Sequence, residues 1–217
     1  MIEWHNELSS TNDEAKRRLE TLDNLSVIAA VRQTAGRGRG SHSWISAPGE
    51  NLTFSVVLAF GQGGPAPLPA SDAIRITQLA SVSVCDFLVS EGLDPRIKWP
   101  NDVWVEDRKI CGILIENTLS GDFISRSIMG IGLNLGQKEF DPALPNPTSL
   151  SLETGRSYRP DEALDSLYEI ICRRAEELST AGGRARLELE FSKRMFVLDK
   201  PSQDSLLASI EDFEARR

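Results

Sequence analysis

The chain has 217 residues, of which 40% are hydrophobic and 26% are charged; this suits one folded core and argues against a disordered chain. Its formal net charge of -8 gives a nucleic-acid partner no electrostatic support. Three widely spaced cysteines and two histidines indicate neither a disulfide framework nor a metal site built from protein ligands.

The N-terminal part of the chain predicts strands around one short helix. Residues 2–8 read as a first strand, and Ser10 or Thr11 is placed to cap a following helix. The apolar run at 25–32 is typical of a central strand. It leads directly into the glycine-rich loop "QTAGRGRGSHSW" at 33–44, which suits neither a helix nor a strand.

The middle of the chain alternates between strand and helix patterns. Residues 51–60 predict a long strand, which glycine and proline then end. Apolar residues at spacings of three and four predict an amphipathic helix over 72–91. Three further strand candidates follow at 97–105, 109–117 and 123–135, with short polar turns between them.

A second amphipathic helix is predicted at 159–180, and the pattern is weak from Lys193 onward. Strands followed by helices, without regular alternation, predict an α+β fold with a mixed or antiparallel central sheet flanked by helices. Since the N-terminus is polar and no run of about 18 apolar residues occurs, we expect a cytoplasmic protein with no membrane contact.

The glycine-rich loop is the first candidate site. Gly36, Gly38 and Gly40 alternate with Arg37 and Arg39, so the backbone can approach a ligand while two guanidinium groups face it. Such groups suit carboxylate and phosphate. A surface loop with solvated arginines is about as plausible on this motif alone.

Lys109 and the pair Asn101 and Asp102 form the second candidate. Lys109 opens an apolar strand at the rim of the sheet, where an ammonium can be partly desolvated. Asn101 and Asp102 follow a proline that ends a strand, which fixes an amide and a carboxylate at an edge. Taken singly, an ordinary turn lysine and an Asx turn explain these residues as well.

The motif "GIGLN" at 130–134 is the third candidate. In a strand, Gly130, Gly132 and Asn134 face one way, so we expect a ligand to lie flat against bare backbone. Close packing of another element is the alternative.

Together, these motifs resemble the catalytic domain of the biotin protein ligases. The matching pieces are "STN" (10–12), "QTAGRGR" (33–39), Trp44, "NLTFS" (51–55), "KWPNDV" (98–103), "RKICGILIE" (108–116) and "GIGLN" (130–134). The resemblance implies a biotin/lipoate ligase fold similar to class II aminoacyl-tRNA synthetases, with a catalytic domain at 1–190. It also implies formation of biotinyl-5′-AMP from biotin and MgATP, and transfer of biotin to a lysine of a biotin carboxyl carrier protein.

The same resemblance implies a role for each matching residue. Lys109, Arg37, Arg39 and Asp102 correspond to the catalytic group. The expected biotin-binding residues are Ser10, Thr11, Asn12, Gln33, Arg37, Gly38, Arg39, Lys109, Gly112, Leu114, Gly130 and Gly132. The expected ATP-binding residues are Arg37, Arg39, Trp44, Asn101, Lys109 and Asn134, with magnesium near the phosphates.

Two features of these motifs need a structural explanation. Strict alternation along the strand places Lys109 and Gly112 on opposite faces, so sharing one pocket requires a twist, which we expect at the preceding turn. The acceptor lysine must also lose a proton, and Asp102 is the carboxylate that we expect to orient or deprotonate it.

The sequence departs from the family pattern in three places. Gly40 stands where a basic residue is common, which removes a cation from the loop. The chain starts at the catalytic domain, so we expect no winged-helix DNA-binding domain and no DNA partner. Residues 201–217 read as more helical than β, so we expect 191–217 to be a truncated or atypical segment in place of the usual SH3-like barrel.

Two alternative functions stay open from the motifs. A lipoate or octanoate ligase or transferase shares the fold, although the "GRGR" and "KWPND" motifs favour biotin. A biotin-binding protein without turnover is the other alternative, and Lys109, Arg37 and Arg39 argue against it. We also expect a possible homodimer through a sheet edge, for which residues 123–135 are the candidate strand.

Overall fold

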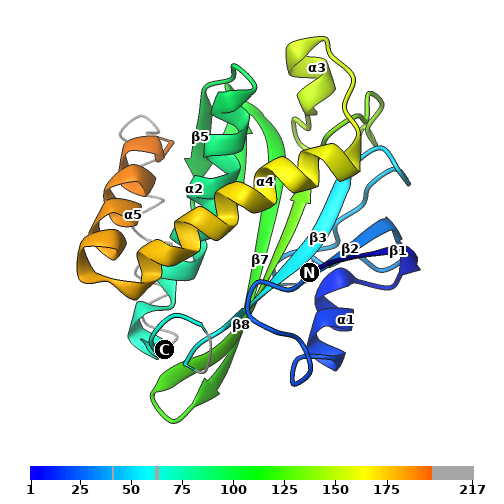
Figure 1. Ribbon diagram of the computed structural model, residues 1–217. Coiled ribbons are helices and arrows are strands. Elements are labelled where there is room, and N and C mark those ends of the chain that lie inside the picture. Colours follow the sequence, from blue (N-terminus) through cyan, green and yellow to red (C-terminus); the bar gives the residue numbers. More distant parts are fainter. Residues whose placement is uncertain (41, 62–63, 197–217) are drawn as a thin grey trace.

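The apolar runs of the sequence form the strands of one eight-stranded sheet (Figure 1). The structure is a computed structural model that describes residues 1–40, 42–61 and 64–196. The strands are β1 (Ile2–Leu8), β2 (Val27–Gln33), β3 (Leu52–Ala59), β4 (Leu68–Pro69), β5 (Pro95–Lys98), β6 (Asp102–Val105), β7 (Arg108–Ser120) and β8 (Phe123–Leu133). The helices are α1 (Thr11–Arg17), α2 (Ile74–Ser90), α3 (Leu150–Thr154), α4 (Pro160–Ala175) and α5 (Ala181–Arg194), with 3-10 turns η1 (Ala70–Asp72) and η2 (Glu176–Ser179).

The sheet is mixed, as predicted. Its strand order is β1-β2-β3-β8-β7-β6-β5, and the short β4 pairs with one end of β8. Only β1 and β2 run parallel among these pairs, because α1 and the chain after it cross over between them. The other pairs are antiparallel. The α+β fold with flanking helices is therefore confirmed.

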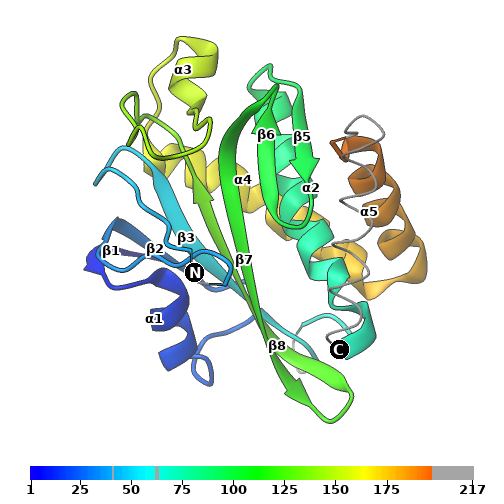
Figure 2. The same cartoon turned by 180° about the vertical axis from the view of Figure 1, so that it is seen from behind.

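Helices cover the two faces of the sheet unequally. Helices α2 and α4 lie behind the sheet in Figure 2, where they pack on a large core that includes Phe54 and Val56. Helix α1 covers part of the other face through a small cluster that includes Val57. Neighbouring residues of β3 thus face different helices, which explains why this strand is buried along its whole length. The rest of the α1 face carries the site described below.

Two strand predictions need correction. Residues 97–105 form a hairpin of β5 and β6 rather than one strand, because the segment 99–101 makes the turn between them. The predicted edge strand at 123–135 is wrong in its position: β8 lies between β3 and β7 in the middle of the sheet. Its apolar character reflects burial on both faces, and a contact between copies would need another surface.

Helix α2 is the most apolar helix of the described residues. With the preceding turn it forms a segment, Ala70–Ser90, that is long and apolar enough to cross a membrane, but 61% of its apolar 18-residue window is buried inside the protein. Its buried side chains include Ile76, Leu79, Val84 and Phe87. Core packing accounts for its composition.

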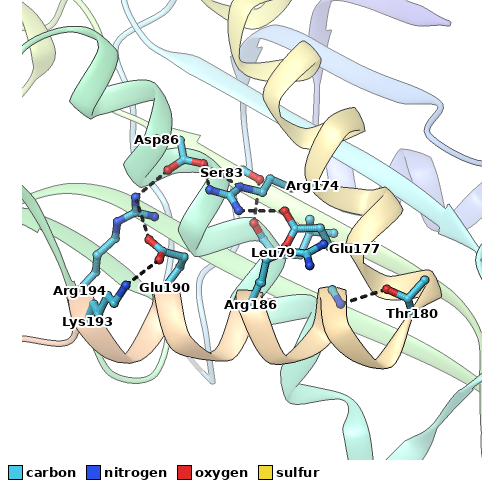
Figure 3. A network of polar contacts seen from close by, with 11 residues as sticks. Leu79, Ser83, Asp86, Arg174, Glu177, Thr180, Arg186, Glu190, Lys193 and Arg194 are labelled. Carbon is cyan, nitrogen blue, oxygen red and sulfur yellow. Dashed lines mark hydrogen bonds and ion pairs between the residues drawn. The ribbon is translucent and has the colours of Figure 1, made fainter.

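Helix α5 was not predicted, and it is tied to α2 and α4 by charged side chains (Figure 3). Asp86 of α2 accepts hydrogen bonds from Arg174 of α4 at 2.8 Å and from Arg194 of α5 at 2.7 Å. These side chains are about one-fifth exposed, so the ion pairs are only partly screened by solvent. Helix α5 therefore runs across the expected domain boundary at residue 190, and residues 197–217 lie outside the described part.

All three cysteines are free, as expected from their spacing. Burial raises the pKa of Cys85 to about 12, so its thiol stays protonated and unreactive at neutral pH.

Candidate functional site

A cavity of about 160 Å³ opens on the α1 face of the sheet. The start of α1, the loop after β2, the β5–β6 turn and the strands β7 and β8 contribute its walls. Every predicted site residue except Asn134 lines it: Ser10, Thr11, Asn12, Gln33, Arg37, Gly38, Arg39, Trp44, Asn101, Asp102, Lys109, Gly112, Leu114, Gly130 and Gly132. His42, Ser43, Ile113 and Ile131 also line it and were not predicted.

Neutral polar groups form one end of this cavity. Ser10 caps α1 by accepting a hydrogen bond from the Asp13 amide at 3.4 Å, as predicted. The Thr11 amide donates to the Gln33 side chain at 2.8 Å. Since Thr11 and Asn12 are nearly fully buried, such hydrogen bonds are needed to offset their desolvation.

Asn12 is held from two sides by residues that sequence reasoning did not single out. The Ser55 hydroxyl donates to Asn12 Oδ1 at 2.6 Å, and Asn12 Nδ2 donates to Glu116 Oε2 at 2.8 Å. Ser55 and Glu116 stand within the quoted motifs, at the ends of "NLTFS" and "RKICGILIE". Each contacts Asn12 from a position more than 40 residues away in the sequence, and a local pattern does not reveal such contacts.

Side chains, rather than open space, cover the glycines of β7 and β8. A Cβ atom at Gly130 would lie 2.2 Å from Asn12 Oδ1, and one at Gly132 would lie 2.3 Å from the Trp44 ring. A Cβ at Gly112 would also meet Trp44, at 2.9 Å. The expectation that a ligand lies on bare backbone therefore needs correction: these glycines make room for Asn12 and Trp44, which line the cavity themselves.

Lys109 and Asp102 form an ion pair at the other end, with 2.8 Å between Nζ and Oδ1. Lys109 pairs with Trp104 across the β6–β7 ladder, whereas Cys111 pairs with Val103, so Ile110 is an extra residue in β7. This β-bulge turns Lys109 and Gly112 to the same side. The expected twist exists, but it lies at Ile110 within the strand and not at the turn before it.

The glycine-rich loop folds back on itself as a small hairpin. The Gly38 amide donates to the His42 carbonyl at 2.8 Å, and the Trp44 amide donates to Gly36 at 2.9 Å. An isolated bridge joins Arg37 to Ser43. This arrangement places Trp44 over the sheet and both arginines at the cavity.

Arg37 is held by two carboxylates in this structure. Its Nη2 atom lies 2.7 Å from Glu116 Oε2 and 2.8 Å from Asp13 Oδ1. Burial alone would raise the pKa of Glu116, but hydrogen bonds from Asn12 and Arg37 outweigh it and lower that pKa. Glu116 is thus a charged partner of the loop at neutral pH.

The cavity favours an anionic ligand near its lysine end. The described residues that line it include Arg37, Arg39 and Lys109, against the single carboxylate of Asp102. Lys109 Nζ also lies 5.8 Å from the centre of the Trp44 ring. Asn12 and its neighbours form the neutral end, and Lys109 marks the cationic end. In this structure Arg37 lies at the neutral end, because its Nη2 and Asn12 Nδ2 both bond Glu116 Oε2.

Two predicted asparagines have structural contacts. Asn101 donates to the Ile113 carbonyl at 2.7 Å and so holds the β5–β6 turn against β7, at the edge of the cavity. Asn134 is buried and donates to the Thr148 carbonyl at 2.9 Å. Asn134 is not among the residues that line the cavity. Its partner Thr148 also donates its backbone amide to the Lys109 carbonyl, so Asn134 supports the segment next to Lys109.

Within the described residues, no group of three or more His, Cys, Asp or Glu side chains is arranged to hold a metal ion.

Known proteins share these motifs and this fold. A model of the biotin/lipoate A/B protein ligase family matches residues 4–134. The biotin–[acetyl-CoA-carboxylase] ligase of Paracoccus denitrificans is 33% identical over 177 residues, which cover 80% of this chain and 72% of that protein. The bifunctional ligase/repressor BirA of Escherichia coli is 31% identical over 147 residues, which cover 67% of this chain but 44% of that protein.

Solved structures show the same architecture. The biotin protein ligase of Aquifex aeolicus in complex with biotin and ATP has a TM-score of 0.75 and 26% identity, with 91% of this chain and 79% of that chain covered. The biotin protein ligase of Leishmania major in complex with biotin has a TM-score of 0.72 at 24% identity, over 92% and 84% of the two chains. The second likeness supports the fold alone.

Proposed function

This chain belongs to the biotin/lipoate A/B protein ligase family, and we propose that it is an ATP-dependent, AMP-forming biotin protein ligase. In this proposal it makes biotinyl-5′-AMP from biotin and ATP and then biotinylates one lysine of a biotin carboxyl carrier protein. The observation that carries the proposal is the single cavity with a neutral hydrogen-bonding end and a cationic end.

The neutral end is proposed to bind the ring system of biotin. A ureido group offers one carbonyl acceptor and two N–H donors, which suit the hydroxyl and amide groups of Ser10, Thr11, Asn12 and Gln33. Leu114 and the Trp44 ring provide apolar walls for the rest of the molecule. Glycine at 112, 130 and 132 is required because larger residues would displace the side chains that shape this end.

The cationic end is proposed to perform the first step. A carboxylate oxygen of biotin attacks the α-phosphorus of ATP, the bond to the bridging oxygen breaks, and pyrophosphate leaves with the electron pair. Lys109, Arg37 and Arg39 would stabilise the negative charge that develops on the phosphoryl oxygens. For this, the Arg37 guanidinium has to leave Glu116 and Asp13 and bind the ligand instead. This movement would close the loop over the cavity.

Trp44 and Asn101 are proposed to contact the nucleotide, and Asn134 to act indirectly by holding the wall behind Lys109. Magnesium fits this site as an ion carried by ATP, since phosphate and water supply most of its ligands and Asp102 and Asn101 offer oxygen atoms. When bound, it would neutralise phosphate charge.

Further parts of the proposal concern partners and location. The similarity to the Paracoccus denitrificans ligase supports the carrier domain of acetyl-CoA carboxylase as the acceptor. A lack of DNA binding agrees with the net charge of -8, and the proposal places the protein in the cytoplasm. A homodimer is testable by sedimentation.

The test is a labelling reaction with the intact chain. Incubation with biotin, MgATP and a carrier domain should add one biotinyl group to one lysine, as measured by mass spectrometry. Lipoate in place of biotin should give no product. Labelling by lipoate alone would identify the lipoate ligase alternative, and biotin binding without pyrophosphate release would identify a non-catalytic protein.

A further inference from the structure

A second cavity of about 180 Å³ lies beside the first. The two share four residues of one wall: Arg39, Asn101, Ile113 and Leu114. The second cavity extends from this wall toward the start of α2, where Ala73, Ile74 and Thr77 line it. It has no role in the binding of biotin or ATP as proposed above.

The sheet creates this cavity because β6 is much shorter than β7. Their ladder ends at the pair of Asp102 and Gly112, while β7 continues to Ser120. Beyond Gly112, the edge of β7 faces the β5–β6 turn and α2, and the turn bonds only to Ile113. Ile115 and Asn117 of β7 then line the cavity, and Asn117 is exposed at its rim.

The wall of the second cavity suits an alkyl chain that ends in an amine. Ile74, Trp99, Pro100 and Ile115 offer apolar surface for methylene groups. The described residues that line it include the cation Arg39 and no carboxylate. Without a carboxylate among these residues, an approaching amine meets no counter-ion in the lining that would favour its protonated form, which cannot act as a nucleophile.

We propose that this second cavity, lined by Thr77 and Asn117 and joined to the first at Arg39 and Asn101, is the channel by which the acceptor lysine of the carrier reaches the acyl-adenylate. The inference rests on the proposed ligase function. In the proposed function, biotin and the nucleotide occupy the first cavity, so the carrier amine would enter through the shared wall. There Asn101 directly precedes Asp102, the ion-pair partner of Lys109.

The step in the channel is an acyl transfer. The lysine nitrogen attacks the acyl carbon of biotinyl-5′-AMP, and an amide bond forms there. The bond between that carbon and the phosphate oxygen breaks, AMP leaves with the electron pair, and the amine proton is released to water. The extended, apolar walls would hold the lysine stem in line with this carbon.

The test separates adenylate formation from transfer. Thr77→Phe and Asn117→Trp place bulk in the second cavity without touching the first, and Val89→Phe on the exposed far end of α2 is the matched control. Biotin-dependent exchange between ATP and pyrophosphate should change less than about twofold in all three. The kcat/KM for the carrier should fall about 100-fold in the two channel variants alone, as expected for a misplaced nucleophile.

Other outcomes would overturn the channel. Asn117→Trp should fold, because residue 117 is exposed. Unchanged carrier transfer in this variant would show that the lysine enters elsewhere. A raised KM for ATP or biotin in both channel variants would make the cavity part of the first binding site. Absence of pyrophosphate exchange in the unmodified protein would instead refute the proposed function, which keeps the two failures distinct.

Discussion

Lys109 Nζ lies 2.8 Å from Asp102 Oδ1, and the β-bulge at Ile110 is what turns the lysine toward this carboxylate and the cavity. Asp102 thus has a defined partner in the structure, which the sequence did not predict. We propose that Asp102 positions the Lys109 ammonium, in addition to any contact with the carrier amine.

Asp102→Asn is therefore expected to slow both steps. Without the carboxylate, the Lys109 ammonium loses its orienting partner, and we expect pyrophosphate exchange and carrier transfer each to fall about 10- to 100-fold. Both rates are measured on the same preparation. If exchange stays normal while only transfer falls, Asp102 acts on the carrier lysine, as first inferred from its motif, and not through Lys109.

Gly130→Ala should weaken biotin binding through Asn12. The added Cβ would lie 2.2 Å from Asn12 Oδ1, so Asn12 has to move and lose its hydrogen bond from Ser55. We expect the Kd for biotin, measured by calorimetry, to rise at least about tenfold. Gly182→Ala is the control, because its nearest neighbouring atom lies 3.9 Å away. Equal biotin affinity in both variants would refute this role for Gly130.

Glu116→Gln should show how much the charge of Glu116, through its ion pair with Arg37, contributes to the free energy of unfolding. The folded protein lowers the pKa of Glu116 below its ordinary value of 4.5, so the stabilising effect is present above that value and is lost as pH falls below it. Glutamine keeps the shape of the side chain but not its charge. At pH 7 the free energy of unfolding should fall by about 0.5–1 kcal/mol, since the pair is partly exposed.

Denaturant titrations at pH 7 and at pH 3 check this prediction. The difference between the unmodified protein and Glu116→Gln should shrink toward the lower pH, because protonation of folded Glu116 removes the charge that glutamine lacks. A difference that stays constant across this range would mean that packing, and not charge, explains the effect.

Asp86→Ala should destabilise the protein without changing the site. It would leave Arg174 and Arg194 without the carboxylate that joins α4 and α5 to α2 (Figure 3). We expect a loss of about 2–3 kcal/mol in the free energy of unfolding. Asp161→Ala, which breaks an exposed pair with Arg159, should have a much smaller effect, because solvent screens that pair. Similar losses in the two variants would contradict the structural role of Asp86.

Local patterns in the sequence predicted most elements and nearly the whole lining of the cavity. The apolar runs of β3 and β8, the periodicity of α2 and α4 and the cap at Ser10 depend on residues that are near one another in the chain. Each motif alone left its residues open to a structural explanation, and the resemblance to the biotin protein ligases is what placed Lys109, Arg37 and the glycines at one site.

The same reasoning missed what depends on register and long-range packing. Helix α5 begins with two glycines after its first residue and has a weak apolar pattern, so only its contacts with α2 show why it forms. Residues 123–135 were only a candidate edge strand, because an apolar strand looks the same in the sequence whether one or two strands pair with it; β8 in fact lies between β3 and β7.

By itself, then, the sequence determined the fold class, the motifs and the residues that meet at the cavity. Only the tertiary structure decided that Ile110 is a bulge, that Asn12 and Trp44 cover the glycines, and that Arg37 is bound by Glu116. The physical reason is that a strand's register and a side chain's partner depend on how segments distant in the sequence pack together. A local pattern contains only residues that are near one another in the chain, so it does not specify these contacts.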